Sequence, residues 1–206
     1  EVIALNKAPG LAVQGGTGTF RHLDGMLDIL RFDAPDRPRL VHRLDRDTSG
    51  VILIARTVRV AADLAAAFKA KTARKVYWAA VAGVPNPRRG VIDLPLDKQI
   101  GPRGERIVAD EEEGKAAITT YRTVDHASKK VAWLAMEPLT GRTHQLRVHA
   151  VALGTPILGD TKYGSRDALA VGADGIAKGL HLHARAIRLP RSSGRMLEVV
   201  APMPAH

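Results

Sequence analysis

One polar stretch of the sequence carries side chains that could do chemistry at a fixed place. It runs from 42 to 50 as His-Arg-Leu-Asp-Arg-Asp-Thr-Ser-Gly and leads into the apolar run 51–55. A short apolar run bounded by turn residues predicts a buried strand, and Gly50 can take the positive φ of a tight turn. Asp45 should therefore lie on a loop that a sheet holds still, where functional groups are often placed. Alternatively, Asp45 pairs with Arg43 or Arg46, or caps the turn.

A second polar cluster lies at 138–150. Thr140 is a credible N-cap for a helix that ends near 153–154, and Arg142 and Leu146, four residues apart, would share a face of that helix. Histidines at 144 and 149 could suggest a zinc site, but there is no His-Glu-x-x-His and the chain has no Cys. Polar or RNA contacts are therefore favoured over a metal site.

Both stretches resemble signature motifs of the RluA-type pseudouridine synthases. The related RsuA-type enzymes share Arg-Leu-Asp, usually lack the preceding His, and end the second motif differently. Further matches follow in the family's order at 5–10, 75–77, 114–116 and 159–164, although the proline of the first is shifted by one place. Residues 13–18 resemble the RluC branch, which modifies large-subunit ribosomal RNA.

The resemblance implies an isomerase that converts uridine in RNA to pseudouridine without a cofactor or a metal. It makes Asp45 the essential carboxylate and Arg142 the partner that orients it and favours its ionised form. Tyr77 would stack on or hydrogen-bond the uracil and could help to remove the C5 proton. Attack at C1′, attack at the base and proton abstraction at C2′ all remain open.

Three further residues would contact the substrate. Arg43 would fill the space that the flipped base leaves, which offsets part of the unstacking energy. Leu146 would form the apolar wall of the base pocket, and His42 belongs to the same motif as Arg43. The alternatives are a phosphate-binding surface Arg43, an ordinary core Leu146, a core Tyr77 and an exposed Arg142.

Composition limits the kinds of partner the protein can have. The chain has 206 residues, 31 Lys and Arg against 21 Asp and Glu, and a net charge of +10. Such an excess favours a polyanionic partner. No run reaches the roughly 18 apolar residues of a membrane span, and no secretory signal is visible. We therefore expect a cytoplasmic protein. The resemblance makes 1–206 a catalytic domain, expected to be monomeric, and implies an N-terminal RNA-binding domain that this sequence lacks.

Periodicity predicts an α+β fold with a mixed, largely antiparallel sheet and a few flanking helices. Helices are expected at 20–31 and at 58–71, the second capped by Thr57. Loops are expected at 14–18 and, as an exposed hairpin or loop, at 101–114. The expected strands are 2–6, 11–13, 51–55, 75–83, 91–96, 116–124, 131–137, 181–189 and 196–201.

Two other functions fit parts of the sequence. A non-catalytic RNA-binding or chaperone protein could share the fold, but the intact Asp45, Tyr77 and Arg142 argue against it. A hydrolase would need a second acid, and no matching motif supplies one. Within the synthase hypothesis, the RNA could also be another class, such as tRNA.

Overall fold

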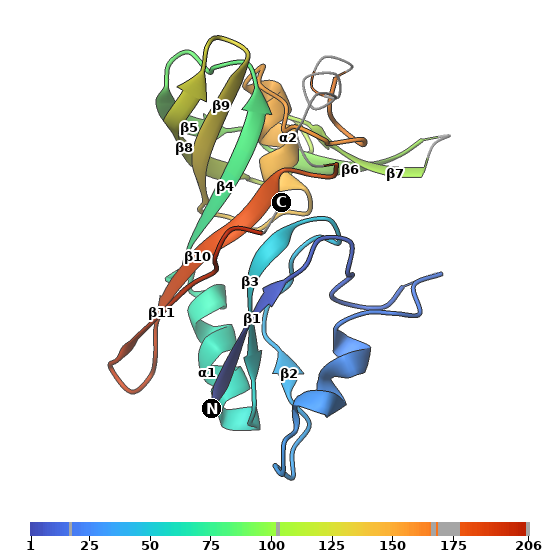
Figure 1. The fold of residues 1–206 in the computed structure, drawn as a ribbon, viewed down its shortest axis with the longest axis vertical. Coiled ribbons are helices and arrows are strands. Elements are labelled where there is room, and N and C mark those ends of the chain that lie inside the picture. Colours follow the sequence, from blue (N-terminus) through green and yellow to red (C-terminus); the bar gives the residue numbers. More distant parts are fainter. Residues whose placement is uncertain (17, 102–103, 166–167, 169–177, 205–206) are drawn as a thin grey trace. The chain divides into compact units, whose positions relative to one another are not determined.

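The computed structural model describes residues 1–16, 18–101, 104–165, 168 and 178–204. They form two compact units (Figure 1). The first comprises Glu1–Lys75 and His183–His206, and the second comprises Val76–Leu182. A single domain over 1–206 stays a prediction.

A sheet centred on β3 (Ser49–Ala55) forms the first unit. Strand β1 (Val2–Lys7) pairs antiparallel with β3, as does the short β2 (Arg39–Leu40). Strand β10 (Leu182–Pro190) runs parallel to β3 at two residues, and β11 (Met196–Val200) is antiparallel to β10. All seven residues of β3 are buried, which confirms the strand that the apolar run predicts.

Two helices complete the first unit. Helix α1 (Val58–Lys69) begins as predicted, because the Thr57 hydroxyl accepts a hydrogen bond from the Val60 amide at 3.3 Å. It buries Val60, Leu64 and Ala67 against β3 and β10. The predicted helix at 20–31 is instead a 3-10 helix, η1 (Asp24–Leu30), which lies beside β2 and lacks a side-chain cap (Figure 1).

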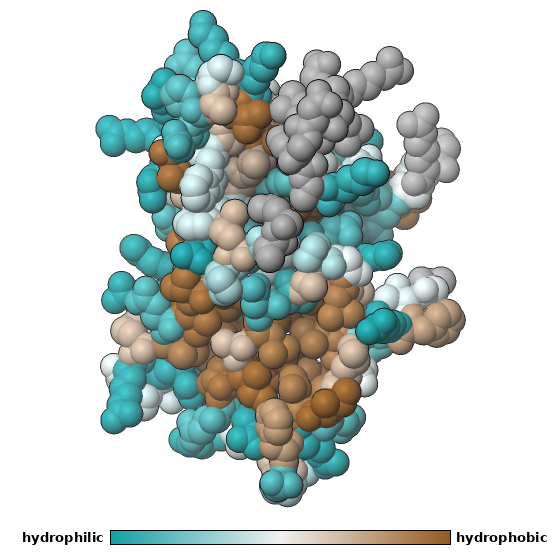
Figure 2. Space-filling model, in the orientation of Figure 1, coloured by the Kyte–Doolittle hydropathy of each residue, from teal (hydrophilic) through white to brown (hydrophobic). Residues whose placement is uncertain are grey.

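The short return strand predicted at 11–13 is wrong. Ala12 makes only an isolated bridge with His22, because the chain turns away after it to form the loop before η1. Thr17, in the predicted loop 14–18, lies outside the described residues. Figure 2 shows a broad apolar area on the first unit, and the large hydrophobic side chains that this unit exposes include Phe20, Ile29 and Phe32.

The second unit is built from antiparallel strands. Strand β4 (Arg74–Ala82) enters it at Val76 and pairs with β9 (Val131–Pro138). Strand β8 (Ile118–Ala127) lies between β9 and β5 (Arg89–Asp93). Strands β6 (Leu96–Gly101) and β7 (Gly104–Ala109) form the hairpin expected near 101–114, whose residues 102–103 lie outside the described part.

Helix α2 (Gln145–Ala152) covers one face of this second set of strands. Leu146 and Ala150 pack into a core with Ala79, Leu134 and Met136. Both units therefore combine mostly antiparallel strands with few helices. This arrangement confirms the predicted α+β class.

Candidate active site

The loop that carries Asp45 is fixed through its backbone. Asp45 begins a tight turn in which the Thr48 amide donates to the Asp45 carbonyl at 3.2 Å. On the other side Leu44 is buried, with 5% of its surface exposed. The carboxylate of Asp45 is half-buried, and the neighbouring Arg43 is exposed. The structure thus places Asp45 on a rigid loop beside β3, as the sequence predicts.

The carbonyl of Arg46 ties this loop to the opening turn of the chain. It accepts hydrogen bonds from the Gly10 amide at 3.0 Å and from the Lys7 ammonium at 2.9 Å. The Arg46 guanidinium donates back to the Gly10 carbonyl at 3.2 Å. Sequence reasoning matched residues 5–10 to a family motif but assigned no role to Lys7, because its partner on this loop, Arg46, lies 39 residues along the chain.

His42 connects the loop to β3. Its Nε2 accepts a hydrogen bond from the Leu53 amide at 2.8 Å, so the proton of the neutral ring is on Nδ1. The ring lies 4.8 Å from that of Phe68, between centroids. Burial, followed by the nearby charge of Lys75, lowers the pKa of His42 to about 4. The substrate contact predicted for His42 therefore has only Nδ1 and the ring edge available.

Acidification is expected to destabilise the protein through His42. The folded state keeps this ring neutral between pH 6.5 and about 4, whereas the unfolded state takes up a proton there. Stability is thus fully present above pH 6.5 and is lost as pH falls towards 4, by about 3 kcal/mol. Urea unfolding at pH 7.5 and 4.5 measures the loss.

The matched variants for this prediction are His42→Gln and His126→Gln. A Gln carbonyl can accept the Leu53 amide without titrating, so His42→Gln should lose markedly less stability on acidification. His126 is exposed, and His126→Gln should follow the wild type. An equal loss in His42→Gln and the wild type would refute the assignment.

The structure brings Tyr77 and Leu146 together in the second unit. Tyr77 lies on β4 opposite Met136 of β9, is half-buried, and packs against the core that contains Leu146. Leu146 itself is only 6% exposed. The two residues thus share one apolar core of the second unit.

Arg142 does not share a helix face with Leu146, and this prediction is wrong. Helix α2 begins only at Gln145, after His144 at a positive φ of 53°. The Thr140 hydroxyl, expected to cap the helix, instead accepts the Ile118 amide at 2.9 Å. Arg142 is exposed ahead of the helix, where its Nε donates to the Ala116 carbonyl at 3.1 Å.

The first turn of α2 is instead anchored by buried polar groups. Gln145 accepts from the Arg142 amide at 3.0 Å and donates to the Ile118 carbonyl at 3.0 Å. Arg147 pairs with Asp160 through two hydrogen bonds of 2.8 and 2.6 Å. Burial is the largest single influence and raises the pKa of Asp160, but the hydrogen bonds from Arg147, Tyr163 and Lys162, together with the positive charge of Arg147, lower the pKa on balance. Sequence reasoning placed Gln145 and Arg147 among polar or RNA contacts and did not predict these buried partners.

The site residues are thus divided between the two units. Asp45, Arg43 and His42 belong to the first unit, and Tyr77, Arg142 and Leu146 to the second. The described ranges contain no group of three or more His, Asp or Glu side chains that could hold a metal ion. Nor does the described part of the chain contain a helix long and apolar enough to cross a membrane.

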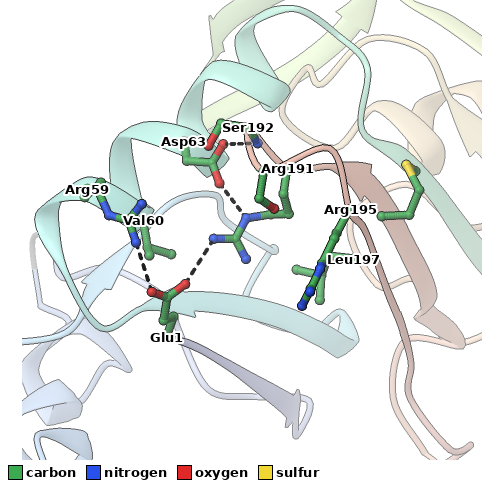
Figure 3. A pocket seen from close by; sticks show the side chains of 10 residues that line it. Glu1, Arg59, Val60, Asp63, Arg191, Ser192, Arg195 and Leu197 are labelled. Atoms are coloured by element: carbon green, nitrogen blue, oxygen red, sulfur yellow. Dashed lines mark hydrogen bonds and ion pairs between the residues drawn. The ribbon is translucent and has the colours of Figure 1, made fainter.

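A cavity of about 290 Å³ lies elsewhere in the first unit (Figure 3). Within it, Asp63 on α1 accepts hydrogen bonds from the Arg191 guanidinium and, at 2.8 Å, from the Ser192 amide. These bonds, the one from Arg191 foremost, lower the pKa of Asp63. The lining includes none of the six candidate site residues, and we interpret its ion pairs as a link between α1 and the β10–β11 turn.

Known proteins share both the sequence and the fold. The family model for RNA pseudouridylate synthase matches residues 1–152. An RNA pseudouridine synthase from Zymomonas mobilis is 40% identical over 99% of this chain and 90% of its own length. The ribosomal large subunit pseudouridine synthase C of Rickettsia conorii is 39% identical over 92% of this chain. This name agrees with the predicted resemblance to the RluC branch.

The structural comparison points the same way. The structure of human RNA pseudouridylate synthase domain containing 4 has a TM-score of 0.78 and 28% identity, over 98% of this chain and 85% of that one. The chain spans 64% of a Synechocystis relative that is 38% identical, and 60% of the Rickettsia conorii protein. By these matches, the chain belongs to the RNA pseudouridylate synthase family.

Proposed function

We propose that the protein isomerises uridine to pseudouridine in RNA, with Asp45 as the essential residue. The observation that carries the proposal is a single half-buried carboxylate on a turn that backbone hydrogen bonds hold still. In the reaction the bond from C1′ to N1 of uracil breaks, the base turns, and C1′ bonds to C5. The C5 proton leaves and N1 gains a proton, so atoms and electrons balance without a cofactor.

Each of the remaining candidate residues is assigned its own role in the reaction. A carboxylate can add covalently to the substrate or stabilise positive charge at C1′, as it does in glycosidases. We assign Tyr77 and Leu146 to the uracil, Arg142 to pairing with Asp45, and exposed Arg43 to the space that the flipped base leaves. His42, whose Nε2 is already bonded to Leu53, acts mainly by holding the motif in place.

We further propose large-subunit ribosomal RNA as the substrate. Several relatives at 36–39% identity carry the name ribosomal large subunit pseudouridine synthase C, and the net charge of +10 suits a large RNA.

The test is to map pseudouridines in all RNA classes from cells that lack the gene. The gene is then restored as wild type or as Asp45→Ala. We expect specific sites in large-subunit ribosomal RNA to disappear and to return only with the wild type. Loss confined to tRNA would replace the substrate assignment. Unchanged pseudouridine at every site would favour a non-catalytic RNA-binding protein on the same fold.

A further inference from the structure

Strands β4, β9, β8 and β5 of the second unit form a sheet with two unlike faces. Helix α2, the one helix in the described part of this unit, packs on the face that carries Ala79, Leu134 and Met136 (Figure 1). Side chains alternate between faces along a strand, so Trp78 points away from the face to which its neighbour Tyr77 belongs. The opposite face, here called the outer face, therefore carries neither of the residues that we assign to the uracil.

One row of residues across the outer face brings aromatic and basic side chains together. Trp78 on β4 is paired in register with Ala135 on β9. Ala135 is paired with Arg122 on β8, which is paired in turn with Arg89 on β5, so the row spans three strand spacings, about 14 Å. Trp133 points to the same face, and its ring lies edge-to-face with that of Trp78, at 4.5 Å between centroids. Both tryptophans are half-buried, whereas both arginines are exposed.

The two arginines face each other at a cost to stability. Directly opposite residues have Cβ atoms about 5 Å apart, and like charges in such a pair destabilise a sheet. Among the described residues, neither guanidinium forms an ion pair. Asp93 and Glu137 share the outer face but lie further along their strands, towards its other end. The positive charges of Arg89 and Arg122 are therefore available to an anionic ligand.

The end of the sheet at which these arginines lie is basic as a whole. Exposed Arg88 precedes β5, and exposed Lys129 and Lys130 lie in the turn between β8 and β9. The Gly83 amide donates to the Lys130 carbonyl at 2.7 Å, which joins this turn to the loop before β5. The segments that form this end, 78–92 and 121–135, contain five Arg and Lys and a single acid, Asp125. This imbalance favours a polyanion as the ligand.

We propose that the outer face binds a single-stranded segment of the RNA substrate, with Arg89 and Arg122 on its phosphates and the Trp78–Trp133 pair against its bases. Guanidinium groups hold phosphates bidentately, and any base can stack on an aromatic ring. The edge-to-face arrangement leaves ring faces that the partner ring does not cover. Other four-stranded sheets that bind RNA stack about two or three bases. The inference rests on the proposed function in taking RNA as the ligand.

The tryptophans report on this face directly, because the chain contains two and both belong to it. A base that stacks on an indole ring quenches its fluorescence. We expect single-stranded RNA of about 12 nucleotides, within the usual range of site sizes, to quench the emission. Anisotropy of a label on the same RNA measures binding in parallel, and the two titrations should share one midpoint. RNA that binds without quenching would overturn the inference.

Two comparisons identify what the face binds. Duplex RNA of the same sequence keeps its base faces inside the helix and should bind without quenching. Equal quenching by duplex and single strand would overturn the stacking arrangement. A fluorescence change that follows protein concentration in the absence of RNA would make a second copy of the chain the occupant and would also overturn the inference.

The arginine pair is tested by combining Arg89→Thr with Arg122→Thr. The matched control combines Lys69→Ala with Arg188→Thr and removes two exposed charges from the first unit. Loss of two phosphate contacts should reduce the slope of log Kd against log salt concentration by about 1.4 for single-stranded RNA. The control should keep the wild-type slope. Equal slopes in the two variants would overturn the assignment of phosphates to these arginines.

Stability and turnover distinguish a binding face from a structural one. Because Thr suits a strand and the like-charge pair is gone, the Arg89→Thr, Arg122→Thr variant should unfold at the same urea concentration as the wild type or a higher one. Its KM should rise, while turnover at saturating RNA stays within about twofold of the wild type. A lower unfolding midpoint together with weaker binding would overturn the inference. A wild type inactive on every RNA would overturn the proposed function instead, and quenching would still decide whether this face binds RNA.

Discussion

Replacing Asp45 with Asn is expected to reduce pseudouridine formation by about 10⁴-fold or more, the upper end of what one positioned acid–base group contributes. Asn keeps the shape of the side chain but removes its negative charge. The turn should survive, because its backbone carbonyls accept hydrogen bonds from the Thr48 and Gly10 amides and from the Lys7 ammonium. Single-turnover rates and RNA-binding titrations on the same preparation measure the two effects separately.

Asp47→Asn is the matched control for this prediction. Asp47 lies two residues away on the same turn, is exposed, and approaches Arg46 only at 4.0 Å. It should retain most of the wild-type rate, and RNA affinity should change by less than about twofold in either variant, because phosphate contacts by other basic residues supply most of the affinity. A near wild-type rate for Asp45→Asn would remove the proposed mechanism.

The largest loss of stability is expected from Asp160→Asn. The Asp160 carboxylate accepts two hydrogen bonds from Arg147 and further ones from the amides of Lys162 and Tyr163 at 3.0 and 2.9 Å. Both side chains are buried, with 6% of Arg147 and 1% of Asp160 exposed. Removing one partner of a buried ion pair costs about 3–5 kcal/mol. Chemical denaturation at pH 7 measures the change.

A double-mutant cycle tests the same ion pair. Arg147→Met with Asp160→Asn should cost clearly less than the sum of the single changes, because the double variant removes both charges of the pair. Asp125→Asn, at an exposed position on β8, is the control and should be nearly neutral. Strict additivity would mean that the pair contributes through packing alone.

Local patterns in the sequence predicted most of the fold. The run 51–55 became the buried strand β3, and Thr57 capped α1, because each signal depends on neighbours within a few residues. The start of α2 could not be predicted in this way. Thr140 has the right side chain for a cap, but its hydroxyl bonds the Ile118 amide, 22 residues away. A long-range contact took precedence over a local preference, and Arg142 was placed on the wrong element as a result.

The same distinction applies to the candidate site. The turn residues around Asp45 predicted a fixed loop, and the structure has one. The supports of that loop were not predictable, because the Lys7–Arg46 bond spans 39 residues and the His42–Leu53 bond spans 11. For Lys7, the match of residues 5–10 to a family motif was the available signal. The motif match identified the position of Lys7 but not the Arg46 carbonyl to which its ammonium bonds.

Packing requires a glycine at position 50 of the central motif. It has a positive φ of 110°, and a Cβ there would lie 2.2 Å from the Ala184 carbonyl oxygen. Any side chain would push β3 away from the strand that carries Ala184. A protein of this fold that had lost Asp45, and with it the chemistry, would therefore still need the glycine. A genome search that scores the Thr-Ser-Gly ending would therefore detect the fold, and under the proposed mechanism an aspartate at position 45 is required in addition for activity.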